Sequence, residues 1–181
     1  MKVTVRYAES FALLSGKGRM QSKFKILVKS MAGPLVVGAV SGFLARGGIE
    51  KYETWNRVFL SPPGWLFPMI WMILYLLMGA AAYLVRTSKA EKQHIAEAVT
   101  IYNLLLFVQF LWIIFFFVLE LQIFAFAWLI VLWLLAAVTV ILFYSAKKPA
   151  GVLMLFYLLW TTYTGYLNLA FCILQIGMMT A

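Results

Sequence analysis

The sequence lacks most of the side chains that catalytic triads and metal sites require. Its 181 residues contain no aspartate, a single histidine, His94, and a single cysteine, Cys172. One cysteine excludes a disulfide framework and a thiolate metal cluster. A Ser-His-Asp triad and a multi-histidine zinc site lack their parts as well. We therefore expect no metal site and no resident cofactor, and we interpret His94 as a solvated loop residue and Cys172 as a packing residue.

Charged residues are also scarce. They make up 12% of the chain, about half of the ~25% typical of soluble domains. Hydrophobic residues account for 65% of the chain, and the mean hydropathy is +0.94. The net charge of +9 comes from basic residues that flank apolar segments instead of forming an aromatic-interleaved basic patch. We therefore attribute it to membrane topology and expect no nucleic-acid partner.

The apolar residues gather in long segments. Five of them can be distinguished, at about residues 26–45, 65–85, 96–119, 121–146 and 151–178. Each is long enough to cross a bilayer as a helix, which takes about 20 residues. Only Glu120 and its neighbours separate the third segment from the fourth, which predicts a tight hairpin. The fold class that follows is an all-α integral membrane protein, a bundle of five transmembrane helices.

Basic residues are concentrated in alternate connections. They precede the first segment and lie between the second and third and between the fourth and fifth; these residues are Lys17, Arg19, Lys23, Lys25, Arg86, Lys89, Lys92, Lys147 and Lys148. Cytoplasmic connections carry such an excess of lysine and arginine. We therefore predict an N-terminus inside and a C-terminus outside.

Two regions outside the apolar segments have their own interpretation. Residues 1–24 form a short basic extension ahead of a membrane domain of residues 25–181, and two explanations stay open. Either translation starts at Met20, or the extension is a short cytoplasmic tail. The loop of residues 47–64 contains Tyr52, Trp55 and Phe59, an aromatic content that predicts a lid folded over the mouth of the bundle.

The second segment has an unusual aromatic face. It opens with Pro62, Pro63 and Gly64, followed by Trp65. Helical spacing then puts a tryptophan and a tyrosine on one face, which consists of Trp71, Leu74, Tyr75 and Met78. A helix that only contacts lipid does not need such residues, so this face packs specifically or lines a cavity.

This segment resembles the second helix of the TspO/MBR family, the tryptophan-rich sensory proteins or translocator proteins, also called peripheral-type benzodiazepine receptors. The residues that carry the resemblance are the Pro62-Pro63 pair, Trp65, Trp71, Leu74-Tyr75, Met78-Gly79 and Tyr83-Leu84-Val85. A second stretch is similar to the fifth helix of the family through Tyr157-Leu158-Leu159-Trp160, Tyr163, Tyr166, Leu167 and Asn168. The similarity covers about residues 30–176.

The resemblance implies a tetrapyrrole pocket lined by Trp71 and Trp160, with Tyr52 at its mouth. Trp160, Thr164 and Asn168 share a stripe that is unfavourable toward lipid and should face the interior. Stacking area for a macrocycle would come from aromatic walls. The complete set of expected ligand-binding residues is Tyr52, Trp71, Tyr75, Phe124, Trp160, Tyr163, Thr164, Leu167 and Asn168.

Several functions are compatible with this resemblance. The first is a membrane sensor that binds porphyrins (protoporphyrin, haem) and similar planar apolar ligands. The second is light- and oxygen-dependent porphyrin degradation, with Trp71 and Trp160 as the catalytic residues. The third is transport of tetrapyrroles or lipids. The expected location is a bacterial cell membrane, and the G-x-x-x-G step of Gly38 and Gly42 indicates close packing within the bundle or a homodimer face.

The chain departs from the family pattern at three places. Arg57-Val58-Phe59-Leu60 replaces the usual Lys-Pro-x-Trp run before the proline pair. Gln109 stands where relatives have an asparagine, and an interhelical hydrogen bond is its simplest role. Trp128 occupies a position where relatives often have an aspartate, so we expect no role that depends on that carboxylate.

Overall fold

The computed structural model describes residues 2–47 and 62–180, and the side chains of residues 20–47 and 62–173 within them. The helices in this part of the chain are α1 (Lys2–Leu44), α3 (Leu66–Arg86), α4 (Lys92–Ile113), the π-helix η1 (Ile114–Val118), α5 (Gln122–Ala146) and α6 (Lys148–Thr180). The π-helix continues α4 directly, so the two form one rod.

Five stretches of the described helices have the length and apolar composition needed to cross a membrane: Met20–Leu44, Leu66–Arg86, Lys92–Val118, Gln122–Ala146 and Lys148–Ile173. The predicted five-helix bundle is therefore confirmed. The helices extend beyond the apolar segments, because backbone hydrogen bonding continues into the polar flanks. Helix α1 in particular runs without a break from Lys2 through residue 24.

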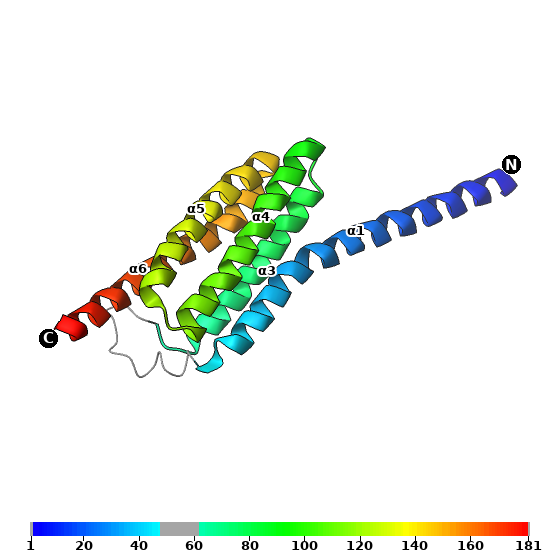
Figure 1. Cartoon of the computed structure of the whole chain (residues 1–181). Coiled ribbons are helices and arrows are strands. Elements are labelled where there is room, and N and C mark those ends of the chain that lie inside the picture. The colour runs from blue at the N-terminus through cyan, green and yellow to red at the C-terminus, as the bar shows by residue number, and fades with distance from the viewer. Residues whose placement is uncertain (1, 48–61, 181) are drawn as a thin grey trace.

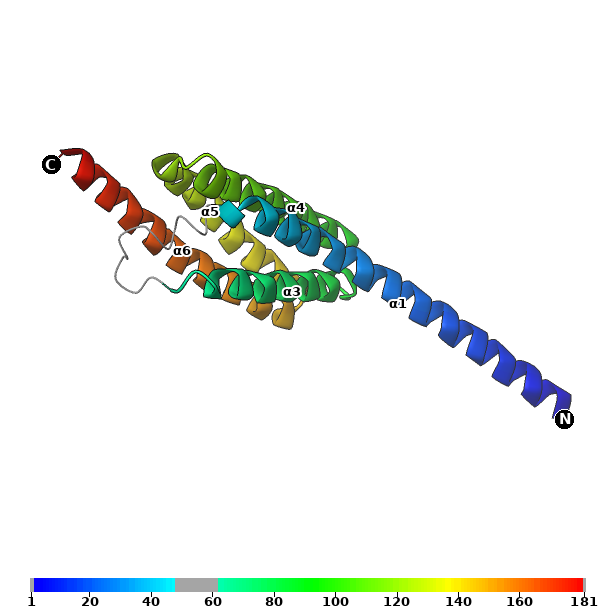
Figure 2. The ribbon, with the colours of Figure 1, turned by 90° about the horizontal axis from the view of Figure 1, so that it is seen from below.

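The helices form a bundle in which α3 is packed between α1 and α6. Helix α6 also packs along α5, α5 along α4, and α4 along α1. Figures 1 and 2 show the resulting arrangement, with the N-terminal part of α1 and the C-terminal part of α6 projecting from opposite ends of the bundle. The interior is thus enclosed by consecutive helices and by pairs distant in sequence, such as α3 with α6 and α1 with α4.

The connections between the helices are short. Helix α3 leads to α4 through residues 87–91, and Lys147 alone separates α5 from α6. Between η1 and α5 the chain reverses at Leu119, Glu120 and Leu121, where Glu120 has a φ of 55°. The Leu121 N–H donates to the Phe115 carbonyl at 2.9 Å across this reversal. The tight hairpin predicted around Glu120 is therefore confirmed.

Polar contacts join the helices in the interior. The Tyr157 hydroxyl of α6 donates to Gln109 Oε1 of α4 at 2.9 Å, with both side chains fully buried. This confirms an interhelical hydrogen bond as the role of Gln109. Trp128 donates from Nε1 to the Val108 carbonyl at 3.0 Å, so it joins α5 to α4.

The interpretation of His94 as a solvated loop residue is wrong. It lies in the first turn of α4, and its Nε2 is 2.8 Å from Ser145 Oγ and 3.2 Å from the Leu142 carbonyl. The helix begins at Lys92, within the polar flank of the apolar segment. His94 therefore connects the start of α4 to the end of α5.

Candidate functional site

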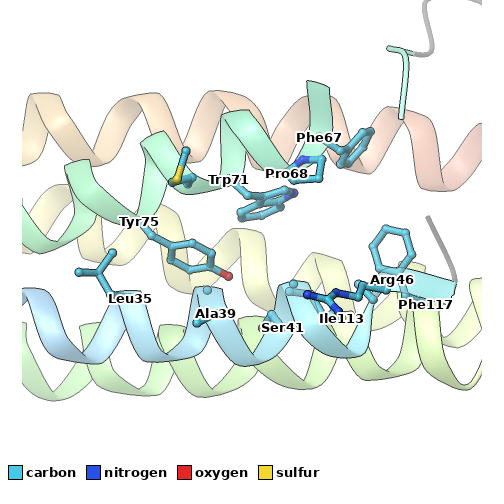
Figure 3. A pocket seen from close by; sticks show the side chains of 14 residues that line it. Leu35, Ala39, Ser41, Arg46, Phe67, Pro68, Trp71, Tyr75, Ile113 and Phe117 are labelled. Atoms are coloured by element: carbon cyan, nitrogen blue, oxygen red, sulfur yellow. The ribbon is translucent and has the colours of Figure 1, made fainter. Parts of the chain in front are cut away.

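A cavity lies between α1, α3 and the α4–η1 rod. Its volume is about 490 Å³. Figure 3 shows how side chains from these helices face one another across it. The lining residues are Leu35, Gly38, Ala39, Ser41, Gly42, Ala45, Arg46, Phe67, Pro68, Trp71, Met72, Tyr75, Ile113 and Phe117.

One wall of the cavity is aromatic and comes from α3. The Trp71 ring is 5.8 Å from the Tyr75 ring and 6.3 Å from the ring of Trp112 on α4, measured between centroids. It also meets Tyr157 of α6 edge-on at 6.3 Å. These neighbours restrict Trp71, so that it presents a fixed aromatic surface to whatever occupies the cavity.

The opposite wall comes from α1 and consists of small residues. Gly38, Ser41, Gly42 and Ala45 recur at the spacing that keeps side chains on one face of a helix. A Cβ on Gly38 would lie 2.6 Å from Cδ2 of Tyr75, so the glycine allows α1 to approach α3 closely. One turn further, a Cβ on Gly42 would meet nothing within 4 Å, so space remains there between α1 and the aromatic wall.

Polar groups reach the cavity at two places. The hydroxyls of Tyr75 and Ser41 are buried and form no hydrogen bond with any described residue. Arg46 lines the cavity near the C-terminal end of α1, with its guanidinium carbon 5.1 Å from the centroid of the Phe43 ring. The cavity is otherwise apolar.

The comparisons with known proteins agree with this architecture. The model of the TspO/MBR family matches residues 30–174, which include all five membrane-spanning helices except their outer ends. The chain belongs to the TspO/MBR family.

Individual relatives show how far this membership extends. The chain is 32% identical to the tryptophan-rich protein TspO of Chlorobaculum tepidum over 144 residues, which cover 79% of this chain and 90% of the relative. It is 35% identical to the tryptophan-rich sensory protein of Cereibacter sphaeroides, over 66% of this chain and 73% of the relative. The chain is 31% identical to protein CrtK of Rhodobacter capsulatus, over 65% of this chain and 73% of the relative.

Family membership, the bacterial relatives and the five apolar helices together identify a multi-pass integral membrane protein of the bacterial type. The resemblance in the second and fifth helices is thereby confirmed. It extends over the whole bundle, because the relatives match across most of their own length.

The structure brings only part of this TspO/MBR member's predicted site together. Trp71 and Tyr75 line the 490 Å³ cavity, whereas Trp160 and Tyr163 line a shallower groove of about 350 Å³ between α3 and α6. Phe67 lies between them, since its ring lines the cavity and meets the Trp160 ring edge-on at 5.7 Å. Trp160 therefore adjoins the cavity without lining it.

The remaining predicted residues of α6 lie deeper in the bundle. Thr164, Leu167 and Asn168 are buried and surround a small space of about 10 Å³ together with Trp112 and other aromatic residues. The polar part of the predicted stripe does face the interior, as expected. The space itself is too small for any organic ligand.

Phe124, which we expected among the ligand-binding residues, does not line the cavity. It is 48% exposed, and its ring packs against Phe115 at 4.8 Å and Trp128 at 6.2 Å. Helix α5 packs on α4 and α6 and does not contact α1, so Phe124 lies away from the cavity. Tyr52 and Arg57 lie outside the described residues.

Several residues that line the cavity were not predicted from the sequence. Phe67, Met72 and Phe117 have no distinguishing pattern among the many apolar residues of their helices. The wall on α1 does have a signal, because small residues recur there from Gly38 to Ala45. A small-residue face opposite an aromatic face indicates either close contact or a cavity, and here it provides both.

Proposed function

We propose that this protein is a membrane sensor that binds porphyrins and similar planar apolar ligands in the cavity between α1, α3 and α4. The observation that carries the proposal is the pairing of a fixed Trp71 surface with a wall of small residues on α1. This leaves a wide, apolar space beside an aromatic face. A relative named as a tryptophan-rich sensory protein supports a sensory role.

The size and composition of the cavity suit such a ligand. Its volume of about 490 Å³ lies within the ~300–1,000 Å³ common for small-molecule sites. An aromatic side chain stacked against a ring adds about 0.5–1.5 kcal/mol beyond the burial of apolar area. Trp71 and Tyr75 offer two such side chains, so the ring of a ligand would be recognised mainly by stacking.

The ligand would enter from the bilayer. Leu35 on α1 and Met72 on α3 line the cavity and are 40% and 58% exposed. Both lie in membrane-spanning stretches, so the gap between these helices opens toward lipid. A poorly water-soluble porphyrin would then reach the cavity without crossing water.

The charged substituents of the ligand would lie at the end of the cavity that Arg46 lines. Arg46 lines the cavity, is exposed and is close to the end of the first spanning stretch. Its guanidinium can pair with a propionate carboxylate there without a charge being buried in the bilayer. His94 contacts Ser145 and Leu142 at the other end of the bundle, so the protein would recognise the ring and not the metal.

Degradation of porphyrin by Trp71 and Trp160 together has less support. Such a reaction requires both indoles near the same ligand, whereas Trp160 lines the groove between α3 and α6. No feature of the described residues favours transport over binding. Binding is therefore the function that the geometry supports best.

The test is a titration of the detergent-purified protein with protoporphyrin in the dark, followed by quenching of tryptophan fluorescence. We expect saturable binding that Trp71→Ala weakens about tenfold, the effect of losing about 1.4 kcal/mol of stacking and burial. Trp133→Ala is the matched control, because Trp133 lies on the outer face of α5 and bonds to Thr162. Non-saturable quenching, or equal affinities in the two variants, contradicts the proposal.

A further inference from the structure

Two hydroxyl groups without hydrogen-bond partners meet at the cavity. Tyr75 of α3 and Ser41 of α1 both line it, and they are only 3% and 2% exposed. Neither Tyr75 Oη nor Ser41 Oγ forms a hydrogen bond within residues 2–47 and 62–180. In Figure 3 the Tyr75 hydroxyl points across the cavity toward α1, the helix that carries Ser41.

Several threonine hydroxyls in the membrane-spanning helices bond within their own helix. Thr139, Thr161 and Thr164 each donate to the carbonyl four residues earlier in their own helix, at 2.7–2.9 Å. This local bond is the usual solution for Ser and Thr in apolar surroundings. Ser41 does not form it, so its hydroxyl remains available to the cavity.

Leaving such groups unpaired inside a membrane is unfavourable, because no bulk water can replace the missing partner. The polar neighbours of the Tyr75 hydroxyl are the side chains of Ser41 and Gln109. Gln109 accepts a hydrogen bond from Tyr157 through Oε1, and its Nε2 has no partner among the described residues. Both hydroxyls face the cavity and can donate, so an acceptor oxygen that enters the cavity would satisfy them.

We infer that Tyr75 and Ser41 form a polar subsite that selects ligands carrying a neutral acceptor oxygen, such as the carbonyl of an ester or of a protonated carboxylic acid. This inference rests on the proposed function and names the ligand class. A neutral oxygen fits best, because an ionised group at this buried position would lose its hydration, whereas Arg46 can serve a carboxylate at the exposed end.

The test compares two porphyrins of the same ring size. Protoporphyrin dimethyl ester carries carbonyl oxygens, whereas octaethylporphyrin carries no oxygen at all. We expect Tyr75→Phe and Ser41→Ala each to weaken binding of the ester about fivefold, the effect of one net hydrogen bond. Binding of octaethylporphyrin should change less than twofold, because both variants keep the shape of the apolar walls.

Matched controls exist for both substitutions. Tyr102→Phe and Ser30→Ala also remove a buried hydroxyl that lacks a partner, but neither residue lines the cavity. These variants should bind both porphyrins like wild type. A thermal unfolding curve for each variant checks that the bundle is intact.

The outcomes separate the two proposals. If wild type binds both porphyrins saturably and Tyr75→Phe affects them equally, the subsite is wrong while the proposed function stands. Unchanged ester binding in both cavity variants overturns the subsite too and indicates that water satisfies these hydroxyls. If wild type binds neither porphyrin, the proposed function fails, and the subsite fails with it.

Discussion

Single glycines determine how closely α1 approaches α3. Gly38 and Gly42 are one helical turn apart on the same face, and both line the cavity. A Cβ on Gly38 would lie 2.6 Å from the Tyr75 ring, whereas a Cβ on Gly42 would meet nothing within 4 Å. The G-x-x-x-G step is therefore asymmetric, with one residue at a contact and the other at open space.

Gly38→Ala should accordingly destabilise the protein, and Gly42→Ala should not. The added methyl at Gly38 forces the Tyr75 ring or α1 to move, and such overpacking costs about 1–3 kcal/mol. Alanine at Gly42 meets no atom and can raise stability by up to about 1 kcal/mol through its helix propensity. Unfolding of both variants in detergent measures the difference. Equal stabilities would contradict the contact between Gly38 and Tyr75.

Residue-level prediction from the sequence succeeded where a pattern fixes a helix face. The face of Leu74, Tyr75 and Met78 was predicted from spacing, and these side chains are buried. Phe124 was assigned through the family resemblance, and its outward position follows from which helices α5 packs against. Packing partners of this kind depend on the order of helices in space, which spacing within one helix does not determine.

At the scale of the helices, a buried hydrogen bond holds α4 against α6. Tyr157 donates to Gln109 Oε1 at 2.9 Å, and both residues are at most 1% exposed. Membrane helices gain little from the hydrophobic effect on association, so such bonds contribute to their specificity. The bond also orients Gln109, which is a polar neighbour of Tyr75 at the cavity.

Tyr157→Phe should therefore destabilise the bundle by about 1–3 kcal/mol, because it leaves the buried Gln109 oxygen unpaired. Adding Gln109→Leu removes the unpaired oxygen, so the double variant should recover part of the lost stability. The expected coupling energy between the two substitutions is about 0.6–1.7 kcal/mol. Tyr102→Phe is the control, since the Tyr102 hydroxyl has no hydrogen-bond partner in the described part of the chain. A double-mutant cycle on unfolding in detergent measures these values, and strict additivity would show that the bond contributes nothing.

The helices themselves were largely predictable, whereas their details were not. Apolar length located all five spans, because a bilayer requires it. The π-helix Ile114–Val118 was not predicted, since its apolar residues look like a continuation of α4. In the structure this turn lets Phe116 stack on Trp112 at 5.3 Å while Phe117 lines the cavity. That geometry depends on tertiary contacts.

At the scale of the whole molecule, charge is distributed unequally between the two ends of the bundle. The N-terminal part of α1 and the turns α3–α4 and α5–α6 lie toward one end, and the reversal between η1 and α5 lies toward the other (Figure 1). The first end carries most of the lysines that flank the spans; those of the described side chains are Lys23, Lys25, Lys89, Lys92, Lys147 and Lys148. This distribution predicts which end faces the cytoplasm.

The lysine-rich end should face the cytoplasm, because basic connections are retained on that side of the membrane during insertion. Two single-cysteine variants on a Cys172→Ser background test this, Gln93→Cys at the start of α4 and Leu119→Cys at the reversal, since both positions are exposed. A membrane-impermeant maleimide applied to intact spheroplasts should label Leu119→Cys but label Gln93→Cys only after permeabilisation. The opposite labelling would invert the topology. It would also place Arg46 on the cytoplasmic side, because α1 ends at the same end of the bundle as the reversal (Figure 1).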